Sequence, residues 1–102
     1  MDALTAGGAT SAPSVLERPM ALNPSVSIRP ESFGAMAYHF GTRRLSFLKS
    51  RQLLAVVQAL ADHPSAGQAC HAVGVTDEHL PSYERALTTL ADTDMIVERP
   101  SR

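Results

Sequence analysis

Apolar and polar residues alternate in two stretches between residues 25 and 48, which is the two-residue period of a β-strand. The segment Ser25–Arg29 is the first predicted strand, with Val26 and Ile28 on one face. Pro30 is expected to end this strand, because proline cannot donate a ladder hydrogen bond.

Residues 33–48 are predicted to form a β-hairpin. Gly41-Thr42 stands where a two-residue turn would, with glycine first, as a type II′ turn prefers. This turn pairs Phe40 with Arg43, Tyr38 with Leu45, and Met36 with Phe47. A one-residue slip would mix the two faces of the hairpin. We expect the face with the large apolar side chains to pack on the core, namely Met36, Tyr38, Phe40, Leu45 and Phe47. The other face is mostly small or polar, with Ala35, Ala37, His39, Arg44, Ser46 and Leu48.

After residue 50 the apolar period changes to about 3.6, which predicts helices. Ser50 is suited to cap a first helix over residues 51–62, and Ser65 is suited to cap a second helix that ends at Val73. A third helix runs from about Leu80 to Ala91. Their inward stripes are Leu53, Val56, Val57 and Leu60; Ala69, Cys70 and Val73; and Tyr83, Ala86, Leu87 and Leu90. Met95–Val97 is a final short strand. The main order, three strands and then three helices, predicts an α+β domain with a three-stranded antiparallel sheet and one core.

Bulky apolar residues are sparse before Leu22 and frequent from there to Val97. Residues 1–21 are rich in Ala, Gly, Ser, Thr and Pro, so we expect a disordered tail, because such a segment cannot offset the entropy of ordering. The predicted domain spans residues 22–98, and residues 99–102 form a short second tail. A domain of this size, in a chain of 102 residues, builds one small core and more often binds a partner than catalyses a reaction.

Charged residues are divided unevenly along the chain. The net charge is −1, so the chain as a whole is not a polybasic binder of nucleic acid or of an anionic membrane. Residues 33–51 nevertheless carry four basic residues and no acid, whereas residues 52–102 carry seven acids and three arginines. The basic block would attract an acidic partner, or it is a solvated face that protects an edge strand.

Residues suited to catalysis or metal binding are few and poorly spaced. Cys70 is the only cysteine, which excludes an internal disulfide and a cysteine metal cage and suits a reducing cytoplasm. No apolar stretch is long enough to span a membrane, and the chain does not begin with a secretory signal. We therefore expect no enzyme activity, no metal and no cofactor. The alternative is a small hydrolase or redox enzyme that uses Cys70 or one of the four histidines, His39, His63, His71 and His79.

The second and third predicted helices, with a glycine-containing turn between them, also resemble a helix-turn-helix. A winged-helix DNA-binding regulator is therefore an alternative function. A helix that reads DNA presents Arg, Lys, Asn or Gln to the bases, whereas the third helix presents more acids than fixed positive charges. Charge thus opposes nucleic acid as the partner, since phosphates would repel the acidic half of the chain.

The second strand of the hairpin is the most promising binding feature. If the first strand pairs with the far side of the hairpin, residues 43–48 form an edge of the sheet. An edge offers unpaired N–H and C=O groups to an extended peptide, and the third helix would supply an apolar wall. The alternative is that these apolar side chains merely fill the core.

The segment Tyr38–Leu48, with the sequence YHFGTRRLSFL, resembles the mycofactocin biosynthesis chaperones of actinobacteria. The later pattern from Ala61-Asp62-His63-Pro64 to Met95-Ile96-Val97 agrees with it, so the resemblance covers about residues 22–97. This family is similar to the peptide chaperone of pyrroloquinoline quinone biosynthesis. Both belong to the precursor-peptide recognition elements, and the resemblance implies a winged-helix-like fold of three strands and three helices.

The resemblance also implies a function. The leader of the ribosomally made mycofactocin precursor peptide would add as a strand to the third strand and pack against the third helix. The chaperone would present it to a radical S-adenosylmethionine maturase, which decarboxylates the C-terminal tyrosine of the peptide and crosslinks it to the neighbouring valine. The iron–sulfur and S-adenosylmethionine chemistry would belong to that enzyme. The implied peptide-binding residues are Arg43, Arg44, Leu45, Ser46, Phe47, Leu48, Tyr83, Ala86, Leu87 and Leu90.

Overall fold

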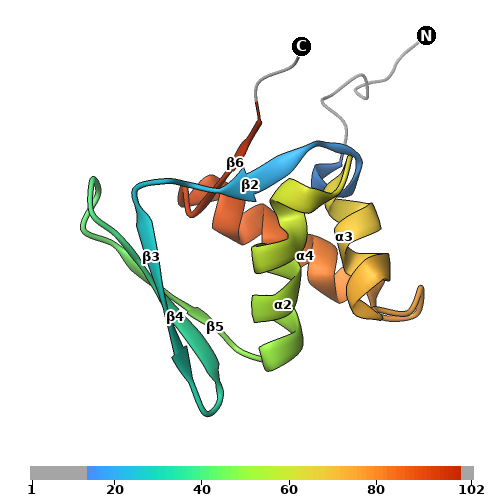
Figure 1. Ribbon diagram of the computed structural model, residues 1–102, viewed down its shortest axis with the longest axis horizontal. Helices are drawn as coiled ribbons and strands as arrows, with labels where there is room; N and C mark the ends of the chain where they lie inside the picture. The colour runs from blue at the N-terminus through green and yellow to red at the C-terminus, as the bar shows by residue number, and fades with distance from the viewer. Residues whose placement is uncertain (1–13, 100–102) are drawn as a thin grey trace, which may run out of the picture.

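The computed structural model describes residues 14–99 and places a sheet on one side of three helices (Figure 1). The elements follow the order η1 (Val15–Glu17), β2 (Met20–Leu22), β3 (Val26–Glu31), β4 (Gly34–His39), β5 (Leu45–Leu48), α2 (Arg51–Ala59), η2 (Leu60–Asp62), α3 (Ala66–Val73), α4 (Leu80–Asp92) and β6 (Ile96–Glu98). The strand order β3-β4-β5, antiparallel throughout, confirms the predicted α+β fold with its three-stranded sheet. Along residues 14–99 no helix has the length and apolar character needed to cross a membrane.

The helices begin and end as their capping residues predict. Ser50 and Ser65 accept hydrogen bonds from the amides of Leu53, at 3.0 Å, and Gln68, at 3.2 Å. Gly74 ends α3 with φ +104°, the left-handed conformation that glycine adopts without strain. The first predicted helix is divided into α2 and η2, because its last turn is 3-10 rather than α.

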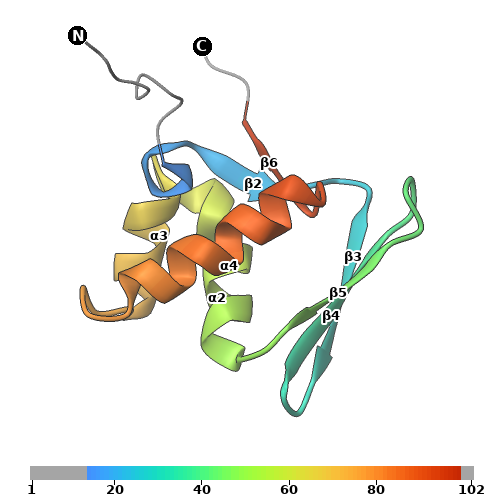
Figure 2. The same ribbon diagram turned by 180° about the vertical axis from the view of Figure 1, so that it is seen from behind.

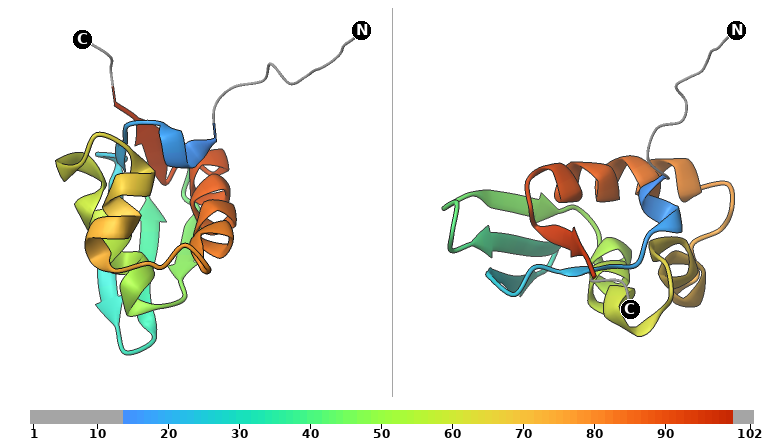
Figure 3. Two further views of the ribbon diagram at one scale, coloured as in Figure 1. Left: turned by 90° about the vertical axis from the view of Figure 1, so that its right-hand side faces the viewer. Right: turned by 90° about the horizontal axis from the view of Figure 1, so that it is seen from above.

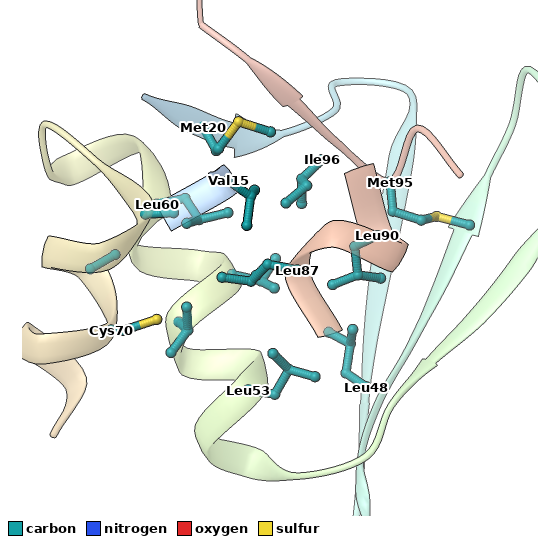
Figure 4. Close-up of a cluster of buried hydrophobic side chains, with 14 of the residues drawn as sticks. Val15, Met20, Leu48, Leu53, Leu60, Cys70, Leu87, Leu90, Met95 and Ile96 are labelled. Carbon is teal, nitrogen blue, oxygen red and sulfur yellow. The ribbon is translucent and has the colours of Figure 1, made fainter. Parts of the chain in front are cut away.

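The core lies where the three helices meet the sheets (Figure 4). The predicted inward stripe of the first helix is buried throughout. In the stripes of the second and third helices, Val73, Tyr83 and Ala86 are only partly buried. The largest fully buried side chains are Met20, Leu48, Leu60, Leu87, Met95 and Ile96.

The packed part of the chain begins earlier than the predicted boundary at Leu22. Val15 and Met20 are buried, and β2 pairs with β6 in a second, two-stranded sheet (Figure 2). Arg99, assigned to a tail, donates its guanidinium N–H groups to the carbonyls of Ala61 and His63. The three residues of β2, Met-Ala-Leu, show no alternation of apolar and polar positions and lie in a segment that composition predicts to be a tail, so this strand was not predicted. The remaining parts of the predicted tails, residues 1–13 and 100–102, lie outside the described residues.

The prediction that Pro30 ends the first strand is wrong, since β3 runs on to Glu31. The amide of Phe40 donates to the carbonyl of Ser25 at 2.8 Å, which makes this pair a hydrogen-bonded one. Hydrogen-bonded pairs recur at every second residue, so the backbone N of Pro30 faces away from β4. Because β3 is an edge strand, the missing N–H of Pro30 removes no ladder bond.

The hairpin register is confirmed, but its predicted turn is wrong. Tyr38 pairs with Leu45 and Met36 with Phe47, as expected. The connection is a four-residue loop, in which the amide of Arg43 donates to the carbonyl of His39 at 2.8 Å. Arg43 takes the left-handed conformation, at φ 65°, and Gly41 does not. Phe40 and Arg43 are therefore loop residues and do not pair with each other.

The predicted inward face of the hairpin is also wrong. Ala35, Ala37 and Leu48 are at most 1% exposed, whereas Phe40, Leu45 and Phe47 are 50–62% exposed. Helix α2 packs directly against β4, and alanine side chains let the helix approach that strand closely. Large apolar side chains would hold the helix away, so the face with the smaller residues became the core face.

His39 fixes the hairpin loop from the core side. Its Nδ1 accepts hydrogen bonds from the amides of Gly41 and Thr42, at 3.0 and 3.2 Å, which requires that Nδ1 carries no proton. The imidazole is 7% exposed. The loop geometry thus depends on one buried acceptor atom.

We expect His39→Ala to lower the free energy of unfolding by roughly 1–2 kcal/mol, because two loop amides lose their acceptor. His39→Asn keeps an acceptor oxygen near the position of Nδ1 and should lose less. Urea denaturation of both variants measures the difference. Equal destabilisation by both substitutions would show that the ring's packing matters and the acceptor does not.

Candidate functional site

β5 is one of the two edge strands of the three-stranded sheet, opposite β3. The amide of His39 donates to the carbonyl of Arg44 at 2.9 Å, so this pair is hydrogen-bonded. Ser46 and Leu48 are then also bonded to β4, because such pairs alternate. Leu45 and Phe47 consequently point their N–H and C=O groups away from the sheet.

A groove of about 430 Å³ lies between this edge and α4. In the right-hand view of Figure 3, β5 is the strand of the three-stranded sheet that lies nearest to α4. The groove is lined by Leu45, Ser46, Phe47, Lys49, Leu53, Ala86, Thr89 and Leu90. Most of these side chains are apolar, and Lys49 is the one charged residue among them. The groove therefore suits an apolar side chain carried by a neutral or acidic segment.

A smaller hollow of about 190 Å³ adjoins the groove. It is lined by Lys49, Ser50, Leu53, Ser82, Tyr83 and Ala86, three of which also line the groove. The Tyr83 hydroxyl donates to Oε1 of Gln52 at 2.9 Å, which fixes the ring beside the start of α2. The two hollows together offer apolar surface along α4 from Leu90 to Tyr83.

Residues 19–97 match the profile of the peptide chaperone MftB family. The chain belongs to this family. It is 53% identical to the peptide chaperone MftB of Mycobacterium tuberculosis over 83 residues, which are 81% of this chain and 76% of that protein. It is 56% identical to the peptide chaperone MftB of Mycobacterium ulcerans over 82 residues, or 79% of this chain and 74% of that protein. The counterpart from Mycolicibacterium smegmatis is 51% identical over 76 residues, 74% of each chain. No solved structure matches.

Membership of the MftB family confirms the resemblance to the mycofactocin biosynthesis chaperones that residues 38–48 indicated. The family is one of peptide chaperones and not of enzymes. The segment of β5 that carries the resemblance is also the edge that borders the groove.

Most residues that the resemblance implied lie around the groove. Leu45, Ser46, Phe47, Ala86 and Leu90 line it, and Tyr83 lines the adjoining hollow. Leu48 and Leu87 are at most 1% exposed and belong to the core. Arg43 and Arg44 lie in and beside the exposed hairpin loop and do not line the groove.

Sequence reasoning did not name Leu53 or Thr89 as site residues, and it included Lys49 only among the basic residues that would attract an acidic partner, although all three line the groove. Leu53 was assigned only to the inward stripe of its helix. The position of Thr89 depends on how α4 crosses β5, and no local pattern reports that crossing.

The side chains that were considered for chemistry do not gather at the groove. Cys70 is fully buried, and burial raises the pKa of its thiol, which opposes formation of the reactive thiolate. Within the described residues, no cluster of three or more His, Cys, Asp or Glu could hold a metal ion.

Proposed function

We propose that the protein binds the leader of the mycofactocin precursor peptide as an added strand on β5 and presents the peptide to the radical S-adenosylmethionine maturase. The chaperone would contribute binding and no bond chemistry. By holding the peptide at the enzyme it would raise the local concentration of the substrate. The redox cofactors of the reaction would belong to the maturase.

The observation that carries the proposal is the position of the free edge of β5 beside an apolar groove. The outward N–H and C=O groups of Leu45 and Phe47 are the partners that an extended peptide needs for strand addition. Side chains of the added strand would alternate in direction, so every second one would enter the groove. We therefore expect the leader to carry apolar side chains at every second position.

Positive charge at both ends of β5 favours an acidic leader. Arg43 and Arg44 precede the strand and Lys49 follows it, and all three are exposed. Exposed charges mainly accelerate encounter, and salt screens them over about 8–10 Å. The association rate should therefore fall as salt is added, with a smaller change in the dissociation rate.

Thr89→Trp tests the groove directly. The indole would occupy the space between α4 and β5, and we expect leader affinity to fall at least roughly tenfold, which corresponds to about 1.4 kcal/mol. Thr88→Trp is the matched control, because Thr88 is also exposed on the same helix but does not line the groove. Isothermal titration with the leader peptide measures both. Unchanged affinity of a folded Thr89→Trp variant would contradict binding in the groove.

Duplex DNA is the partner that the alternative function requires. Helix α4 would be the reading helix, and it carries one basic and two acidic residues. We therefore expect no sequence-specific retention of duplex DNA in gel-shift titrations. Tight retention that weakens steeply with salt would favour the regulator over the chaperone.

A further inference from the structure

The outward face of the three-stranded sheet carries six large apolar side chains that the core does not use. We call this surface the outer face; it consists of Phe33, Met36, Tyr38, Phe40, Leu45 and Phe47. Four of these, Phe33, Phe40, Leu45 and Phe47, are 46–62% exposed. The opposite side of the same strands packs against α2, so nothing within residues 14–99 covers the outer face.

The aromatic rings of the outer face contact one another in two pairs. Phe33 and Phe47 have ring centroids 6.1 Å apart, and Tyr38 and Phe40 have centroids 5.2 Å apart in an edge-on arrangement. Met36 lies between the pairs in the strand register, opposite Phe47. Contiguous aromatic and methionine side chains on a monomer surface are typical of the centre of a protein interface.

Leader binding would leave most of this surface uncovered. The leader pairs with backbone groups of β5, which lie in the plane of the sheet, whereas the side chains of the outer face project perpendicular to that plane. Only Leu45 and Phe47 belong to both the groove and the outer face. The outer face is therefore continuous with the peptide site and remains available to a second partner when the peptide is bound.

The charges around the outer face indicate what that partner is. Residues 26–49 contain four basic side chains, Arg29, Arg43, Arg44 and Lys49, and one acid, Glu31, which pairs with Arg29 at 3.0 Å. The cations at the hairpin loop and at Lys49 have no such acid in this segment. A second copy stacked face to face would bring like charges together. A protein with an apolar centre and an acidic rim complements this surface.

We propose that the outer face is the docking surface for such an acidic partner protein and that it is used at the same time as the peptide groove. The inference rests on the proposed function in one respect, because it takes the partner to be the maturase. The β5 strand then contacts both partners. Its outward backbone groups bind the leader, the side chains of Leu45 and Phe47 border both partners, and the rest of the outer face binds the enzyme.

Phe40→Ser tests this surface, because Phe40 is the most exposed of the large apolar residues and does not line the groove. The affinity of the full chain for purified maturase is measured by biolayer interferometry without peptide, and leader affinity is measured separately. We expect Phe40→Ser to weaken maturase binding at least tenfold and to change leader affinity less than twofold. Phe40→Tyr keeps the ring and should restore maturase binding. Thr89→Trp should instead weaken leader binding and leave maturase binding nearly unchanged.

Each other outcome overturns a distinct statement. Unchanged maturase affinity in a folded Phe40→Ser variant, or no maturase binding by the wild type, would overturn the outer face as the docking surface. A dimer in sedimentation that Phe40→Ser dissociates would assign this face to a second copy instead. A wild type that binds the maturase but not the leader would leave the outer face standing and contradict the proposed function.

Discussion

Proline at position 47 is expected to abolish strand addition while the domain stays folded. The amide of Phe47 points away from the sheet, so Phe47→Pro removes a hydrogen bond to the leader and none to β4. The proline ring would also occupy the place of the incoming strand. The protein already accommodates this arrangement on its other edge, where the nitrogen of Pro30 faces outward from β3. We expect leader affinity to fall at least roughly tenfold.

Two further variants separate the backbone from the side chain. Phe47→Ala removes the same ring and keeps the N–H, so it should bind the leader more tightly than Phe47→Pro. Ser46→Pro places the proline where the amide bonds to Ala37, and it should break the ladder and destabilise the hairpin. Circular dichroism with leader titration distinguishes these effects. Equal affinities of Phe47→Ala and Phe47→Pro would rule out a backbone contact at this residue.

Gly34→Ala is expected to prevent folding of the domain. Gly34 follows the tight turn between β3 and β4 with φ +153°, a conformation that residues with a Cβ rarely adopt. A Cβ built there would lie 2.0 Å from the carbonyl oxygen of Leu48 and 2.8 Å from the amide nitrogen of Ser50. Relief would require β5 to move away from β4. The backbone strain alone is about 1–3 kcal/mol, against a net stability of about 3–5 kcal/mol for a domain of this size.

Gly74→Ala is the matched comparison for Gly34→Ala. Gly74 also has a positive φ, of +104°, but its Cβ would meet only a side-chain nitrogen of Gln52, at 3.8 Å. Strain without overlap should lower the free energy of unfolding by about 1 kcal/mol. Thermal melts followed by circular dichroism measure both. A Gly34→Ala variant as stable as Gly74→Ala would mean that β5 can move away from β4 with little loss of folding free energy.

The features that could be predicted from the sequence are those that neighbouring residues decide. Ser50, Ser65 and Gly74 cap helices through backbone groups a few residues away, so their residue types report the boundaries directly. The register of Tyr38 with Leu45 followed from the position of Gly41-Thr42 and from the alternation of the two faces, since a slip by one residue would exchange the faces.

The features that could not be predicted depend on distant packing. Alternation divides the hairpin into two faces but does not say which face meets α2. Residue size suggested the larger side chains, whereas the close approach of α2 required Ala35 and Ala37. The prediction of the loop conformation was wrong for a related reason. The buried acceptor of His39 holds the amides of Gly41 and Thr42 in place. The sequence does not show that His39 faces inward.

The candidate site was predicted in part for the same reason. Leu45 and Phe47 could be predicted as site residues because the order of strands already indicates that residues 43–48 form an edge. Thr89 joins them only because α4 crosses beside β5. Leu87 was named as a wall of the groove but is fully buried in the core.

The pairing of β2 with β6 has a consequence for engineering. Met20 faces Glu98 across this small sheet, so the first and last strands lie one strand spacing apart, about 4.8 Å. A linker that leaves η1 and Arg99 in place would therefore close the chain into a continuous ring. New termini could then be opened in the exposed loop between α3 and α4, away from the β5 edge. A circular permutant of this kind would keep the groove intact. It would move the attachment point for a fused enzyme or peptide to the N-terminal end of α4.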